Sequence, residues 1–87
     1  MIETLRTISC HSESGRNNSK YILTRYEDED YVSYDVLEKS SHALSCYDHS
    51  SRSFDTFEQA NEYLNKMINF WTSQGGKVYK VYKVYED

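Results

Sequence analysis

The sequence is poor in glycine and cysteine and has no long apolar run, and each shortage excludes a class of protein. Only three glycines occur, too few for the glycine-rich loop that holds phosphate groups in nucleotide-binding enzymes. No apolar stretch reaches the roughly 20 residues that a membrane-spanning helix needs. The first residues lack the basic start and apolar stretch of a signal peptide. We therefore expect a cytoplasmic protein whose two cysteines are reduced thiols.

Tyrosine and negative charge, by contrast, are abundant. Nine tyrosines occur in 87 residues, and aromatic residues make up 15% of the chain, which argues against disorder. The length predicts a single domain over residues 1–87. The formal net charge is −4, which disfavours nonspecific binding to nucleic acid or to anionic membranes.

The charge is unevenly distributed along the chain. Residues 26–31 place four consecutive acids between two tyrosines. Residues 77–85 repeat the triplet Lys-Val-Tyr three times and contain no acid. We therefore expect one strongly acidic surface and, elsewhere, a modest basic stripe.

Alternating, β-branched and aromatic residues predict four strands, over residues 2–8, 20–26, 31–38 and 41–48. Polar and glycine-containing stretches predict turns at 28–30 and 39–41 and connections over 10–19 and 49–53.

A helix after Asp55 is the clearest predicted element. The Asp55 carboxylate can accept N–H groups of the first turn, and Glu58 three residues later fits a capping box. Gly75 and Gly76 end the helix. The last strand is predicted over residues 77–85, inside the sheet, because both of its faces carry apolar side chains. The helix has one apolar stripe, formed by Phe57, Ala60, Leu64, Met67, Ile68 and Trp71.

These elements predict an α+β fold. We expect a four- or five-stranded, mainly antiparallel sheet with one helix packed on one face, in the order βββ(β)αβ. The uncovered face of such a sheet must contact water, a second copy or a partner. The low apolar content and the negative net charge favour water, and hence a monomer.

Residue types alone would allow a zinc site or a catalytic thiol. His42, Cys46 and His49 lie close together in the sequence, with Cys10 and His11 far away, but the paired spacing of a zinc knuckle is missing. Neither cysteine is accompanied by a strained elbow or a glycine-rich oxyanion loop. We therefore expect no metal, no cofactor and no catalytic residue, and so a protein that is not an enzyme.

The acidic segment allows two interpretations. It is either a solvated hairpin tip that protects the sheet from edge aggregation, or a recognition surface. Carboxylates pair with guanidinium groups and tyrosine rings stack on them, so the segment complements a groove rich in Arg and Lys. An array of carboxylates can also occupy the positions of phosphates. The candidate partner-binding residues are Tyr26, Glu27, Asp28, Glu29, Asp30, Tyr31, Tyr34 and Asp35.

The chain resembles the small acidic inhibitors that bacterial viruses encode, among them several anti-CRISPR proteins. The resemblance lies in its size, in the absence of enzyme motifs, in strands that lead into a capped helix at 53–59, and in a surface rich in Tyr, Asp and Glu. It implies a phage protein that acts in the host cytoplasm. Such a protein mimics nucleic acid and blocks the basic nucleic-acid-binding groove of a host or defence nuclease complex, without contacting nucleic acid directly.

Two other functions remain open. A homodimeric regulatory or antitoxin-like domain would associate through the uncovered face of the sheet. A small nucleic-acid-binding module would use ring stacking and phosphate contacts of the C-terminal segment, although core packing with lysines that extend into solvent is the simpler interpretation. The residues of such a module would be Lys77, Tyr79, Lys80, Tyr82 and Lys83.

Overall fold

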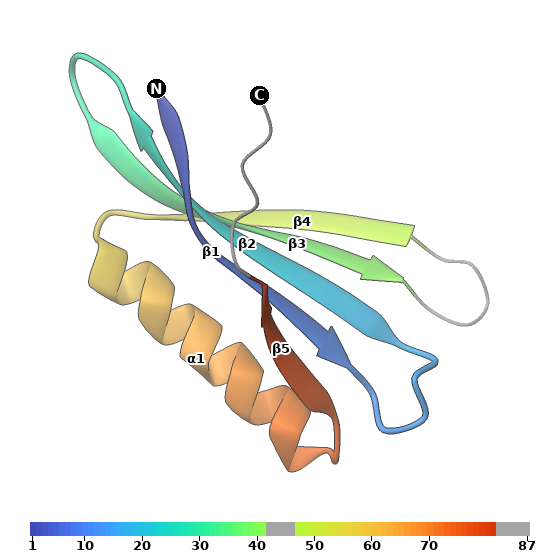
Figure 1. The fold of residues 1–87 in the computed structure, drawn as a ribbon. Helices are drawn as coiled ribbons and strands as arrows, with labels where there is room; N and C mark the ends of the chain where they lie inside the picture. Colours follow the sequence, from blue (N-terminus) through green and yellow to red (C-terminus); the bar gives the residue numbers. More distant parts are fainter. Residues whose placement is uncertain (42–46, 82–87) are drawn as a thin grey trace.

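The structure is a computed structural model that describes residues 1–41 and 47–81. A single helix lies against one face of a sheet (Figure 1). The predicted α+β class, with one helix on a mainly antiparallel sheet, is confirmed. The elements in chain order are β1 (Ile2–His11), β2 (Asn18–Glu27), β3 (Val32–Ser41), β4 (Tyr47–Phe54), α1 (Phe57–Ser73) and β5 (Lys77–Val81).

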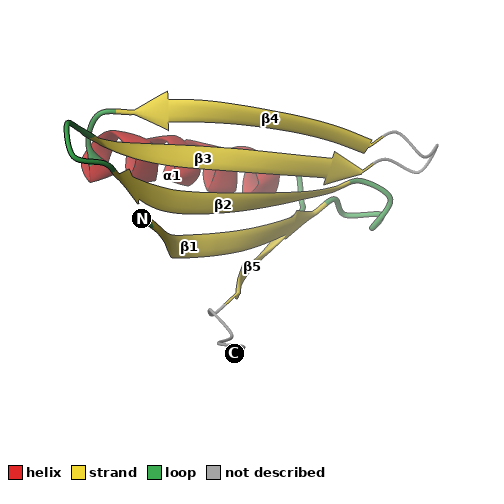
Figure 2. Cartoon of the chain, turned by 90° about the horizontal axis from the view of Figure 1, so that it is seen from above, coloured by secondary structure: helices red, strands yellow, loops and turns green. Residues whose placement is uncertain are grey.

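The five strands lie in the order β4-β3-β2-β1-β5. Each neighbouring pair is antiparallel. Strand β1 is first in the sequence, yet it lies between β2 and β5. Seen from above, the strands run side by side with α1 beneath them (Figure 2). The face that α1 covers is called the helix face here, and the opposite one the open face.

The predicted boundaries of several strands were wrong. Residues 39–41, expected as a turn, lie in β3, and residues 49–53, expected as a connection, lie in β4. Strands β1 and β2 also extend into the expected connection at 10–19. These extensions are rich in serine and other polar residues, so they carry no apolar alternation. Part of the expected strand at 41–48, residues 42–46, lies outside the described residues.

The position predicted for the last strand was also wrong. In the described sheet, β5 is an edge strand beside β1, not an interior one. Its two faces differ, because Val78 packs against the core while Tyr79 is 52% exposed on the open face. Residues 82–85 of the predicted strand lie outside the described part of the chain.

The helix cap is shifted by one residue from its predicted place. Thr56, not Asp55, is the N-cap, and its Oγ1 accepts a hydrogen bond of 3.2 Å from the backbone N–H of Gln59. The Gln59 side chain in turn accepts one of 3.2 Å from the backbone N–H of Asp55. This reciprocal pair replaces the predicted box of Asp55 and Glu58. The predicted glycine end of the helix is confirmed, since Gly75 has a φ of 80°.

The core lies between α1 and the helix face. Leu64 is fully buried against the sheet, and Met67, Ile68 and Trp71 pack around it, so the predicted apolar stripe is confirmed from Ala60 to Trp71. Phe57, its predicted first member, is 37% exposed. Burial of each large apolar side chain stabilises the fold by roughly 1.5–3 kcal/mol. The buried residues of the core are Ile8, Cys10, Tyr21, Leu23, Val36, Ala60 and Leu64.

The open face is not covered by the helix (Figure 2). Side chains of a strand alternate between the two faces, so the residues between the core positions belong to the open face. Ile22 and Leu37 lie opposite each other in the middle of this face. Within the described residues, no helix has the length and apolar character needed to cross a membrane.

Candidate functional site: an acidic tip and a lysine hollow

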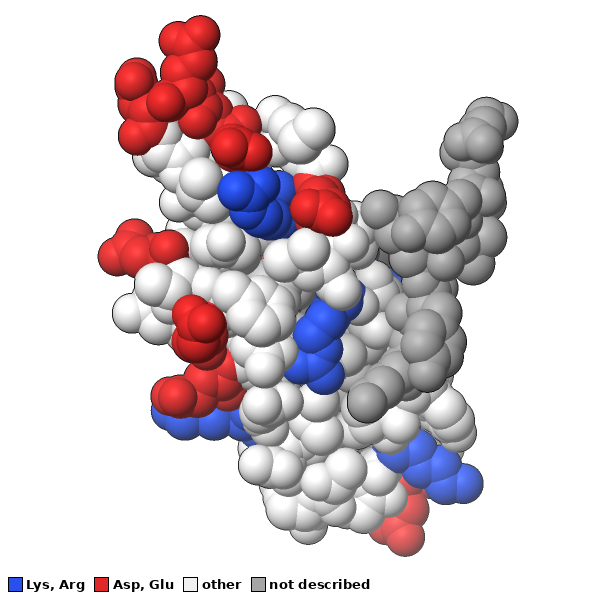
Figure 3. All heavy atoms as spheres, turned by 60° about the vertical axis from the view of Figure 1, so that its left-hand side comes forward, with Lys and Arg blue, Asp and Glu red and all other residues white. Residues whose placement is uncertain are grey.

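The β2–β3 hairpin ends in four consecutive acids, Glu27–Asp30, which are called the acidic tip here. Glu27 pairs with Val32 at the last rung of the ladder. Beyond it, the backbone N–H of Asp28 donates a hydrogen bond of 2.9 Å to the carbonyl of Tyr31. All four acids are exposed. The hairpin extends beyond the start of α1 (Figure 1), and a space-filling view shows acidic side chains gathered at one end of the molecule (Figure 3).

The charge of the acidic tip is mostly uncompensated. Arg25 forms an ion pair of 3.0 Å with Glu27, and one Asp28 oxygen accepts a hydrogen bond of 2.7 Å from the backbone N–H of Glu29. In residues 1–41 and 47–81, no cation contacts the carboxylates of Glu29 and Asp30. Adjacent unpaired carboxylates on a narrow hairpin produce a concentrated negative potential.

Two tyrosine rings flank the acidic tip. The rings of Tyr26 and Tyr31 lie 5.7 Å apart, centroid to centroid, at 47°. Tyr31 is 56% exposed, so its ring is accessible next to the carboxylates. The structure therefore places all the candidate residues from Tyr26 to Tyr31 on one surface.

The other two candidate residues lie elsewhere. Tyr34 belongs to the helix face, where it packs against the core. Its ring packs edge to face on that of Phe57, with the ring centroids 6.2 Å apart. Asp35, its neighbour in the sequence, belongs to the open face and is half-buried. Its Oδ1 is buried without a hydrogen-bond partner among the described residues. Neither residue contributes to the surface of the acidic tip.

Cys10 and His11 occupy different environments. Cys10 is fully buried in the core, where burial and the nearby charge of Glu38 raise the pKa of its thiol to about 11. At neutral pH it is therefore a protonated, unreactive thiol. His11 lies on the open face, where its Nδ1 hydrogen-bonds to Asn18 Oδ1. Its ring and that of Tyr79 pack edge to face, with the ring centroids 5.5 Å apart.

The metal-ligand candidates are only partly described. His42 and Cys46 lie outside the described residues. Over the described part of the chain, no three His, Cys, Asp or Glu side chains are grouped so that they could hold a metal ion.

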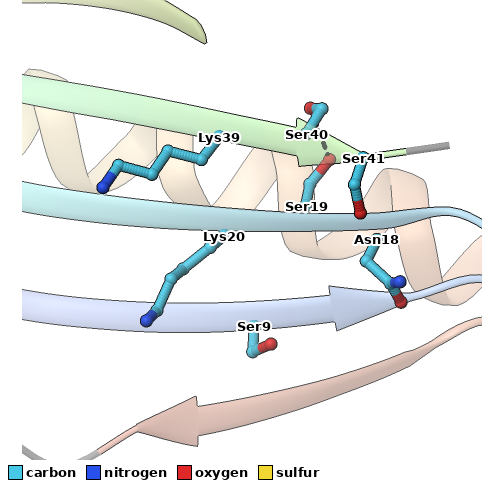
Figure 4. A pocket seen from close by; sticks show the side chains of 7 residues that line it. All are labelled: Ser9, Asn18, Ser19, Lys20, Lys39, Ser40 and Ser41. Carbon is cyan, nitrogen blue, oxygen red and sulfur yellow. Dashed lines mark hydrogen bonds between the residues drawn. The ribbon is translucent and has the colours of Figure 1, made fainter. Parts of the chain in front are cut away.

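A second polar site, which was not predicted from the sequence, lies on the open face. Lys20 of β2 and Lys39 of β3 are direct cross-strand partners. Ser9 lies opposite Lys20 on β1, and His49 lies opposite Lys39 on β4. Next to this row is a hollow of about 270 Å³ (Figure 4), which is called the lysine hollow here. Its lining residues are Ser9, Asn18, Ser19, Lys20, Lys39, Ser40 and Ser41.

The lysine hollow contains no carboxylate. Ser19 and Ser40 line it with the backs of their residues, since their hydroxyls lie on the helix face, where they form a hydrogen bond of 2.8 Å with each other. Among the described residues, neither Lys20 nor Lys39 forms an ion pair or a side-chain hydrogen bond. Two like charges directly opposite each other destabilise a strand pair, so nothing described in the fold explains this pair.

Comparisons with protein-family models, with curated proteins and with solved structures gave no match. The geometry of the acidic tip and of the lysine hollow is therefore the basis for assigning a function.

Proposed function

We propose that the protein is a non-enzymatic inhibitor that binds a basic, nucleic-acid-binding surface of another protein through its acidic tip. The observation that carries this proposal is the set of four consecutive exposed acids at the end of one hairpin. Glu29 and Asp30, which no described cation contacts, are available to guanidinium and ammonium groups of a partner. Such charge-assisted hydrogen bonds are about twice as strong as neutral ones.

The hairpin holds the acidic tip in place before binding. The backbone of Met1 and Glu27 forms two hydrogen bonds, one of 2.9 Å from Glu27 N to Met1 O and one of 3.0 Å from the Met1 ammonium to Glu27 O. The base of the acidic tip is therefore fixed on the β1 side as well as on the β3 side. A preorganised surface loses less conformational entropy on binding.

The chemistry of the acidic tip defines the class of partner. Carboxylates at successive positions present negative charge to a groove that otherwise binds phosphates, and the Tyr26 and Tyr31 rings can stack on arginine side chains. Together with the resemblance to phage-encoded inhibitors, this supports a nuclease complex of a host or a defence system as the target. The inhibitor would act in the cytoplasm as a monomer.

The test is a matched pair of charge-neutralised variants. In the tip variant the four acids are replaced by their amides (Glu27→Gln, Asp28→Asn, Glu29→Gln, Asp30→Asn). The control variant removes four exposed acids elsewhere, at Glu3, Glu13, Glu58 and Glu62. Both variants have the same net charge, so only the location of the lost charge differs.

Wild-type protein, immobilised, is used to isolate a partner from bacterial lysate treated with nuclease, and the affinity of the purified partner is then measured. We expect the tip variant to bind at least tenfold more weakly than the control variant, and wild-type binding to weaken as salt increases. The nucleic acid of the partner should compete with the wild-type protein. Equal affinities of the two variants would contradict the proposal.

A further inference from the structure

We propose that the lysine hollow and the adjacent ring of Tyr79 bind single-stranded nucleic acid through its phosphates and one base. The first support is the chemistry of the lining, which on the open face offers two lysines, the hydroxyls of Ser9 and Ser41 and the amide of Asn18, but no carboxylate. Such a set of groups suits an anion that accepts several hydrogen bonds, as a phosphate does.

The second support is the pairing of Lys20 with Lys39. Their cross-strand register places two positive charges side by side at a cost in stability. In Figure 4 both side chains extend toward the same end of the sheet, away from the end where Asn18 and Ser41 lie, so both ammonium groups lie at one end of the hollow. A phosphate placed between them would offset their repulsion, whereas among the described residues no acid forms an ion pair with either lysine.

The third support is an aromatic ring in the same row. Ser9 pairs with Lys20 on one side and with Tyr79 on the other, so the ring and the lysine pair lie on one line across the sheet. Tyr79 is 52% exposed, and its ring is held by the edge contact with His11. An exposed ring beside cations is the arrangement on which bases of a single strand stack while their phosphates are neutralised.

The spacing of the row also suits a single strand. Tyr79 and Lys20 lie on strands two positions apart, and at about 4.8 Å per strand this separates them by roughly 10 Å. Lys77 precedes Tyr79 by two residues and lies opposite His11 on the same face, which adds a third cation beside the ring. An acidic peptide would make use of the lysines but not of the aromatic ring, which is why we favour nucleic acid.

The negative net charge does not exclude this ligand. Lys39 and Asp30 are nine residues apart in the sequence, which along an extended strand is roughly 30 Å. The screening length at physiological salt is about 8 Å. The acidic tip and the lysine hollow therefore act as electrostatically separate surfaces. The expectation of no direct nucleic-acid contact rested on the negative net charge and on core packing as the simpler interpretation of the C-terminal lysines. The separation removes the first of these reasons, and the second does not concern Lys20 and Lys39.

Fluorescence anisotropy with labelled dT15 and rU15 at low salt tests the proposal. The site variant is Lys20→Gln/Lys39→Gln, and its matched control is Lys66→Gln/Arg52→Gln, which removes two exposed cations from the helix and from β4. We expect the site variant to bind at least tenfold more weakly than the control, and Tyr79→Ala to weaken binding by a similar factor. The dependence of log Kd on log salt should fall by about 0.7 for each lost phosphate contact.

Two further measurements make every outcome decisive. The site variant should have a melting temperature equal to or above that of wild type, since a repulsive pair has been removed, and this excludes unfolding as the cause of weak binding. Polyglutamate should displace dT15 poorly, whereas unlabelled dT15 should displace it fully. No binding to either oligonucleotide, equal binding by the site and control variants, or equal displacement by polyglutamate would overturn the proposal. The last result would assign the site to an acidic protein segment instead.

Failure here is distinguishable from failure of the proposed inhibitory function. The tip variant tests the acidic tip and should retain oligonucleotide binding. The Lys20→Gln/Lys39→Gln variant, conversely, tests the lysine hollow and keeps all four acids.

Discussion

The indole N–H of Trp71 donates a hydrogen bond of 3.2 Å to the hydroxyl oxygen of Tyr21. The same hydroxyl donates one of 2.8 Å to a carboxylate oxygen of Glu38. The hydroxyls of Ser40 and Ser50 each donate a bond of 3.3 Å to this carboxylate. A chain of polar contacts therefore connects the last turns of α1 with β2, β3 and β4 at one end of the core. Because burial costs a polar group its bonds to water, these bonds are what allow the groups to lie there.

Replacement of Tyr21 by phenylalanine removes the hydroxyl from the centre of this chain. The indole N–H and one Glu38 oxygen lose a partner, and we expect the free energy of unfolding to fall by about 1–3 kcal/mol. Urea denaturation followed by tryptophan fluorescence measures it. Tyr26→Phe, at a half-exposed ring of the open face, is the control and should change stability by no more than about 0.5 kcal/mol. Equal effects of the two substitutions would show that the bonds to Tyr21 do not stabilise the fold.

Leu64→Ala should be the most damaging single truncation of the helix. Leu64 is a fully buried residue of α1 that faces the sheet. Its truncation leaves a cavity and should lower the free energy of unfolding by about 2–5 kcal/mol. For a domain of this size that is a large part of the total stability. Thermal unfolding by circular dichroism, with the exposed Lys66→Ala as control, measures the difference. An unchanged melting temperature would mean that the stripe is not the core of the protein.

The protein should lose stability in alkaline solution. Burial raises the pKa of Cys10 to about 11, and burial also raises the pKa of Tyr21 above its usual range. Both groups are neutral when protonated, so the folded state holds the proton more tightly than the unfolded state does. In the unfolded state the pKa of a thiol is about 8.5. The contribution of Cys10 is therefore complete below about pH 8.5 and is lost as the pH rises toward about 11.

Urea midpoints measured from pH 7 to pH 11 for wild type and for Cys10→Ala test this dependence. The variant should be less stable at neutral pH, because it loses buried volume, but its stability should decline less steeply between these limits. Parallel curves for the two proteins would rule out titration of Cys10 as a cause.

Gly76 should tolerate alanine less well than Gly15. A Cβ at Gly76 would lie 2.5 Å from the backbone oxygen of His11 and 2.9 Å from that of Trp71. Neither atom can move without displacing β1 or α1, and such overpacking costs about 1–3 kcal/mol or more. A Cβ at Gly15 meets no atom within 4 Å, so Gly15→Ala carries only the strain of a φ of 78°, about 1–2 kcal/mol. The two free energies of unfolding give the comparison, and a larger loss for Gly15→Ala would contradict it.

The helix and the class of fold could be predicted because their signals are local. The apolar stripe of α1 and the glycines after it depend only on neighbours within a few residues. Most of strand β4 gave no such signal, because Ser50 and Arg52 on its helix face are polar and find partners across space, and only Phe54 at its end packs against the core. Ser50 bonds to Glu38, and Arg52 lies 5.1 Å from the ring centre of Tyr63. Sequence alone does not contain those partners.

The pairing of Lys20 with Lys39 could have been predicted from the sequence if the hairpin turn had been placed correctly. Glu27 pairs with Val32, so seven steps outward along the hairpin lead to Lys20 and Lys39. The expected turn at 28–30 was one residue too short, and a shift of one residue moves every side chain of a strand to the opposite face. The same alternation places Tyr34 and Asp35 on opposite faces, although both were predicted to belong to one recognition surface of interleaved tyrosines and acids.

The position of β1 inside the sheet has a consequence for synthesis on the ribosome. His11 pairs with Asn18 on one side and with Lys77 on the other, so its two partners leave the ribosome at very different times. Until β5 has been made, one edge of β1 presents unpaired N–H and C=O groups that other nascent chains can pair with. Contacts between residues so far apart in sequence also form slowly. We therefore expect the pairing of β1 with β5 to be the last part of the described sheet to form.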